Sequence, residues 1–161
     1  MSRRDYTACR WTVWVTQTRE TSPQSSTRKE IDIMTYFFNK TVDTSFDQAI
    51  ARVTEELAKE GFGILTEIDV QGTLKKKLDV DFRKYHILGA CNPSFAYRAL
   101  QTEAHIGTML PCNVIVQEYE DGRVEVAAVD PLASMQAIDN TELVEIATKI
   151  RNKLQQVIDR L

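Results

Sequence analysis

Residues 113–129 read NVIVQEYEDGRVEVAAV. Apolar and β-branched residues fill both halves, as is typical of strands, and Asp121-Gly122 between them is a strong signal for a tight hairpin turn. We therefore expect two antiparallel strands, 113–119 and 123–129, joined by a type I′ turn. Asp130-Pro131 ends the second strand, because proline has no N–H to donate to a sheet.

The region before this hairpin alternates between strand and helix patterns. Ser45 and Gln48 have the spacing of a capping box, which predicts the start of a first helix. Asn92 as N-cap and Pro93 at the first helical position predict the start of a third. Three further strands are expected from their aromatic, β-branched and apolar content, at residues 36–42, 62–68 and 85–91.

A long amphipathic helix follows the hairpin. Its apolar residues recur at helical spacing and predict a stripe that packs on a sheet: Leu143, Ile146, Ile150, Leu154, Val157 and Leu161. The order of elements is then β-α-β-α-β-α-β-β-α. We expect an α/β (α+β) fold, a two-layer sandwich with helices packed on a mixed sheet, because helical connections usually cross between parallel strands whereas the hairpin is antiparallel.

The composition is that of a globular protein, with 43% hydrophobic and 27% charged residues among 161. Residues 1–33 are rich in Thr, Ser and Arg, and we interpret them as a flexible N-terminal extension. Residues 34–161 are expected to form a single globular α/β domain. This domain carries a net charge of −5, which argues against nucleic acid as a partner.

The three cysteines, Cys9, Cys91 and Cys112, are an odd number without regular spacing, which is typical of a reducing compartment rather than a disulfide framework. No apolar run is long enough to span a bilayer, and none after Arg3-Arg4 has the length of a secretory signal. We therefore expect a cytoplasmic protein without a membrane partner.

Cys91 is the first candidate for chemistry. It lies at a strand end just before a predicted helix N-terminus, where the helix dipole favours a thiolate. The alternative is a buried apolar cysteine at the end of a central strand. Cys112 opens the next strand. If the two strands are neighbours, Cys91 and Cys112 can approach each other as a redox pair.

Three polar residues complete the candidate ligand or redox site. Asn92 and Asn113 each follow one of these cysteines, and Asp130 stands at a strand end as a general base or as an ordinary turn residue. His86 and Cys91 are too far apart along one strand to share a metal ion, so we expect no metal site and no cofactor. No complete catalytic motif is present, and we lean towards a protein without enzymatic activity.

Several motifs together resemble the family called domain of unknown function 302. They are Gly61-Phe62-Gly63-Ile64, His86-Ile87-Leu88-Gly89-Ala90-Cys91-Asn92-Pro93, Ala99-Leu100, Leu110-Pro111-Cys112-Asn113-Val114 and Val129-Asp130-Pro131. The resemblance covers residues 34–161. It implies a compact α/β domain that forms a homodimer, and it supplies no activity.

Three hypotheses follow. The first is a homodimeric module that binds a small ligand in a groove between sheet and helices, near Cys91, Asn92, Cys112, Asn113 and Asp130. The second is a thiol-based redox or sulfur-handling protein that uses Cys91 and Cys112. The third is a structural or partner-binding dimer whose interface is the C-terminal helix or an edge strand.

Overall fold

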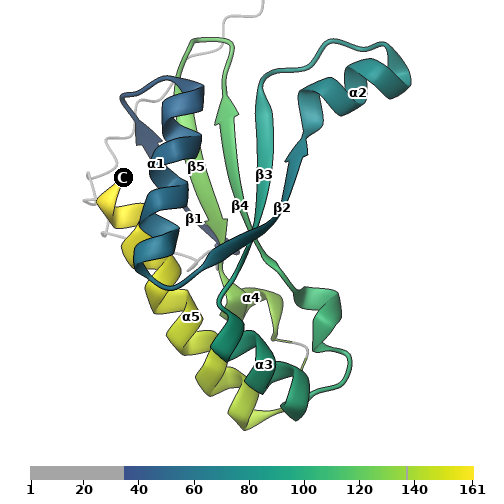
Figure 1. The fold of residues 1–161 in the computed structure, drawn as a ribbon, viewed down its shortest axis with the longest axis vertical. Coiled ribbons are helices and arrows are strands. Elements are labelled where there is room, and N and C mark those ends of the chain that lie inside the picture. Colours follow the sequence, from purple (N-terminus) through teal and green to yellow (C-terminus); the bar gives the residue numbers. More distant parts are fainter. Residues whose placement is uncertain (1–34, 137) are drawn as a thin grey trace, which may run out of the picture. The chain divides into compact units, whose positions relative to one another are not determined.

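A five-stranded sheet is the centre of the fold (Figure 1) in a computed structural model that describes residues 35–136 and 138–161. The strands are β1 (Phe37–Val42), β2 (Gly63–Asp69), β3 (Tyr85–Cys91), β4 (Cys112–Glu118) and β5 (Val124–Val129), in the spatial order β1-β5-β4-β3-β2. The α/β class is confirmed. The predicted extension, residues 1–33, lies outside the described residues.

All four strand pairs are antiparallel, so the expectation of a mixed sheet is wrong. Helix α2 (Val70–Leu78) connects β2 to its neighbour β3, and helix α3 (Pro93–Thr102) lies between the neighbours β3 and β4. These helices extend hairpin connections instead of crossing the sheet. Only the connection through α1 (Phe46–Lys59) crosses it, because β1 and β2 lie at opposite edges.

The β4–β5 hairpin is confirmed, with Gln117 opposite Glu125, but its turn is not type I′. The backbone N–H of Tyr119 donates to Arg123 O, and among the described non-glycine residues only Asp79 has a positive φ. Gly122, at φ 81°, is thus the one turn residue in the left-handed region. A three-residue hairpin loop needs one residue in the left-handed region, whereas a type I′ turn needs two. Glycine adopts this conformation at the lowest energetic cost.

Helices α1 and α5 (Thr141–Arg160) cover one face of the sheet (Figure 1). The predicted capping box is present, because Ser45 accepts from Gln48 N and Gln48 accepts from Ser45 N. Asn140 caps α5 by accepting from two backbone N–H groups. The core between helices and sheet consists of fully buried apolar side chains: Val53, Leu57, Leu88, Val114, Val116, Val126, Leu154, Val157 and Ile158.

Charged side chains join α1 to α5 above this core. Arg160 donates from Nε to Glu56 at 2.8 Å and from Nη2 to Glu60 at 2.8 Å, and Lys153 Nζ lies 3.0 Å from Glu60 Oε2. The hydrogen bond from Arg160 lowers the pKa of Glu60, and the one from Lys59 lowers the pKa of Glu56. Both carboxylates therefore stay ionised and paired at neutral pH.

The remaining short helices are η1 (Ile106–Met109) and α4 (Pro131–Ser134). With α3 and the start of α5 they enclose a second apolar cluster of Ala99, Ile106, Leu143 and Ile146. Within the described ranges, no helix is both long and apolar enough to cross a membrane.

Candidate functional site

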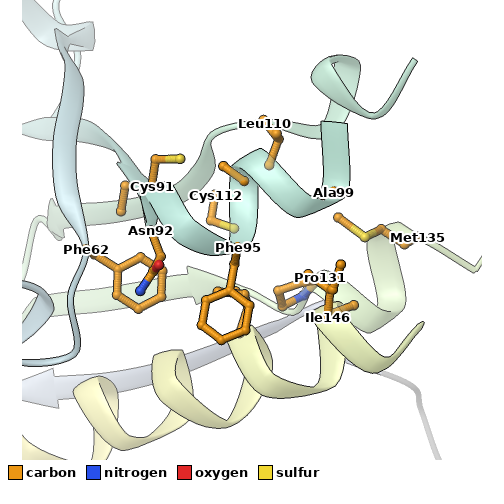
Figure 2. A pocket seen from close by; sticks show the side chains of 14 residues that line it. Phe62, Cys91, Asn92, Phe95, Ala99, Leu110, Cys112, Pro131, Met135 and Ile146 are labelled. Atoms are coloured by element: carbon orange, nitrogen blue, oxygen red, sulfur yellow. The ribbon is translucent and has the colours of Figure 1, made fainter. Parts of the chain in front are cut away.

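Three of the five predicted site residues lie together. Cys91, Asn92 and Cys112 line one cavity, where β3 meets α3 (Figure 2). Cys112 pairs with Ala90 across the β3–β4 ladder, so Cys91 lies one residue past the last position of β3 that is paired with β4. The cavity measures about 30 Å³, which is room for roughly one or two water molecules.

The two thiols lie in apolar surroundings. Both cysteines are free, and Figure 2 shows their side chains among the apolar residues that line the cavity. Burial raises the pKa of Cys91, and burial together with nearby Cys91 raises that of Cys112 to about 11. Both thiols are therefore protonated at neutral pH, which makes them poor nucleophiles.

The side chain of Asn92 is hydrogen-bonded to the backbone of the same chain. It stands at the N-cap of α3 as predicted, but its side chain accepts no capping bond. Its Nδ2 instead donates to Glu60 O at 3.4 Å, next to Gly61, which has φ 82°. A Cβ on Gly61 would lie 3.1 Å from Asn92 Nδ2. Asn92 thus ties the end of α1 to the start of α3.

Asp130 is a buried capping residue, 5% exposed. Its Oδ1 accepts from Leu132 N at 2.9 Å, and its Oδ2 accepts from Arg151 Nε at 2.9 Å. Each carboxylate oxygen thus already accepts a hydrogen bond within the protein. This arrangement fits the turn reading of Asp-Pro and links α4 to α5.

Asn113 lies on the other side of the sheet from Cys112, because neighbouring residues in a strand point to opposite faces. It pairs with Gly89 and lines a much larger hollow, of about 480 Å³, in the face opposite α1 and α5. The floor and walls of this open-face hollow are largely apolar and aromatic: Tyr36, Phe37, Tyr85, Ile115, Ala127 and Val129.

A hydrogen-bonded polar network lies at one end of the open-face hollow. Glu125 Oε1 accepts from Gln117 Nε2 at 2.8 Å and from Tyr119 Oη at 3.1 Å, and Glu125 Oε2 accepts from Asn39 Nδ2 at 2.9 Å. Gln117, only 6% exposed, also accepts at Oε1 from Arg83 Nε at 3.0 Å. The network fixes polar groups beside an apolar floor.

These residues were missed by reasoning from the sequence. The hairpin signal alone places Gln117 opposite Glu125, and strand alternation puts both on one face. The contributions of Asn39 and Arg83 depend on β1 lying beside β5 and on the link before β3, which no local pattern shows.

In the part of the chain that the structure describes, no three His, Cys, Asp or Glu side chains gather in a way that could hold a metal ion. The open-face hollow thus combines apolar and aromatic walls with a set of hydrogen-bonded polar side chains at one end.

Comparisons with known proteins agree with the fold. The family model described as "Domain of unknown function DUF302" matches residues 38–161. A solved structure described as an uncharacterized conserved protein DUF302 from Bacillus stearothermophilus is 31% identical, with a TM-score of 0.73. The match covers 78% of this chain and 97% of that chain. None of the curated proteins matches this chain.

Proposed function

Since the chain belongs to the DUF302 family, whose description assigns no activity, we propose from the geometry that it is a homodimeric module that binds a small ligand in the open-face hollow. The observation that carries this proposal is the size and lining of the hollow. Its volume of about 480 Å³ is within the range of roughly 300–1,000 Å³ usual for ligand sites. Fixed polar groups beside an apolar floor are also typical of such sites.

The proposed site differs from the one expected at the cysteines. A cavity of about 30 Å³ beside Cys91 is too small for a metabolite. Of the five residues singled out in the sequence, only Asn113 lines the open-face hollow. Thiol chemistry at Cys91 and Cys112 is the weaker alternative, because burial raises both pKa values. The free thiols are compatible with the cytoplasmic location predicted from the sequence.

A thermal-shift screen of anionic, neutral and cationic metabolites tests the ligand proposal. A ligand at about a hundred times its dissociation constant adds about 3 kcal/mol of stability, so we expect at least one compound to raise the melting temperature by several degrees. Ala127→Trp, which fills the floor of the hollow, should abolish this shift. Ala51→Trp, an exposed position on α1, should retain it. A screen without any stabilising compound, or a shift that survives Ala127→Trp, contradicts the proposal.

The dimer surface that we propose is the β2–α2 arm, residues 65–80. Helix α2 buries none of its side chains, although Asp69 caps it by accepting from Gly72 N. A helix of nine residues is marginal in water by itself. The arm exposes Leu65 (65%), Ile68 (46%), Leu78 (66%) and Val80 (44%). A second copy of this chain can cover these side chains, because a two-fold axis places the same apolar arm on both partners.

Light scattering at several concentrations tests the dimer. We expect the full chain at about twice its mass of 18.4 kDa. The double variant Leu65→Glu, Leu78→Glu should run as a monomer, since charges in an apolar interface are left without partners. Val144→Glu, which places the same charge at an exposed apolar side chain on α5, is the control and should remain a dimer. A wild-type monomer, or a dimer unaffected by the double variant, overturns the assignment.

A further inference from the structure

Arg83 is the one cation that the structure places in the lining of the open-face hollow, among the described residues. Its Nε donates to Gln117 Oε1 at 3.0 Å. Its guanidinium carbon also lies 4.8 Å from the ring centre of Phe82, 5.6 Å from that of Tyr85 and 5.7 Å from that of Tyr119. One hydrogen bond and three aromatic rings thus orient this side chain, although it is exposed.

The outer nitrogens of Arg83 have no partner in the described part of the chain. Its only hydrogen bond there uses Nε, and it forms no ion pair there. Glu125, the acidic member of the network, instead accepts from Gln117, Tyr119 and Asn39. The guanidinium therefore has unused donors beside an apolar floor, and it is not neutralised by a direct carboxylate contact.

We propose that the open-face hollow binds a small organic monoanion, with its acidic group on the outer nitrogens of Arg83 and a flat apolar body over Ile115 and Ala127. This inference rests on the proposed ligand-binding function and names the ligand's class. A guanidinium pairs with a carboxylate or sulfonate through two parallel N–H···O bonds. Aromatic walls at Tyr36 and Phe37 favour a planar body.

The charges around the site favour a single negative charge. Glu125 is linked to Arg83 through one intervening residue, Gln117, and its carboxylate repels a second charge on the ligand. The other end of the hollow is Asn113, an exposed amide four residues from Gln117 along β4 and so about 13 Å away. Asn113 donates or accepts a hydrogen bond at the far end of an elongated ligand.

Two fluorescent probes with nearly the same body test the anion requirement. 8-Anilinonaphthalene-1-sulfonate is an aromatic monoanion, and N-phenyl-1-naphthylamine is its neutral relative. In fluorescence titrations of the full chain we expect one saturable site that binds the anion at least tenfold more tightly than the neutral probe. Arg83→Gln should remove this preference, because the amide replaces the charge and leaves the fold intact at an exposed position.

Arg98→Gln is the matched control. It removes one positive charge on α3, beside the exposed apolar side chains Tyr97 and Leu100, which offer a competing surface for the probes. We expect less than a twofold change in this variant. Anion binding that falls with Arg98→Gln but not with Arg83→Gln, or no saturable anion binding, overturns the inference. Equal binding of both probes that Ala127→Trp abolishes also overturns it, but leaves the ligand-binding proposal standing.

Discussion

Leu154→Ala is expected to destabilise the protein by about 2–5 kcal/mol, the usual cost of removing a large aliphatic side chain from a core. Leu154 is 0% exposed and lies in the C-terminal half of α5, packed into the cluster between helices and sheet. Its loss leaves a cavity that the rigid sheet cannot close. Because domains are commonly stable by only about 5–15 kcal/mol, this single change removes a large share of the total. Urea unfolding followed by circular dichroism measures it.

Val144→Ala is the control on the same helix. Val144 is 48% exposed, so the same kind of truncation should change the free energy of unfolding by no more than about 0.5 kcal/mol. If Leu154→Ala and Val144→Ala were equally stable, Leu154 would not be packed in the core as the structure indicates.

Gly89→Ala is expected to cost about 1–3 kcal/mol through overpacking. A Cβ at Gly89 would clash with Thr66 Oγ1 and would lie 2.7 Å from Pro111 Cγ. Thr66 is the cross-strand partner of Gly89 in β2, next to an irregularity in the register. The proline ring has little freedom to move, so the strands must separate. Urea unfolding would measure the lost stability, and the NMR spectrum of the backbone amides would show the separation of the strands.

Gly63→Ala tests the same substitution where there is space, because no atom lies within 4 Å of the added Cβ. It should be neutral within about 0.5 kcal/mol. The double variant Thr66→Ala, Gly89→Ala should recover part of the lost stability, since one of the two clashes is gone. A Gly89→Ala protein as stable as the wild type would contradict the close approach of β2 to β3.

The elements themselves could be predicted because their signals are local. The capping box at Ser45, the Asn92-Pro93 start of α3 and the Asp121-Gly122 hairpin each depend on residues a few positions apart. The apolar stripe of α5 is likewise a property of one segment. Such patterns determine where strands and helices begin, and the structure confirms the predicted order of the main elements.

The direction of the strands could not be predicted in the same way. A helix between two strands is the usual sign of a parallel crossover. Yet α2 and α3 lie between antiparallel neighbours, and nothing in the residues 70–78 or 93–102 distinguishes a long hairpin connection from a crossover. Strand neighbours depend on tertiary packing.

The candidate site was found only in part for the same reason. Cys91, Asn92 and Cys112 lie together because β3 and β4 are neighbours. Asn113 lies on the opposite face through strand alternation, and Asp130 is used in capping. The open-face hollow and its polar network form only when β1, β4, β5 and the link before β3 come together. No local sequence pattern spans all of these segments.

The position of β1 has a consequence for how the chain is made. Each of β2, β3 and β4 is paired with the next strand in sequence, so β2 to β5 can assemble in the order of synthesis. Of the five strands described, β1 emerges first from the ribosome, but its only partner in the sheet is β5, near the opposite end of the described chain. The nascent protein must therefore keep Phe37 and Phe38 unpaired until late in translation. Closing this long loop is an entropic cost that makes docking of β1 a late step in folding.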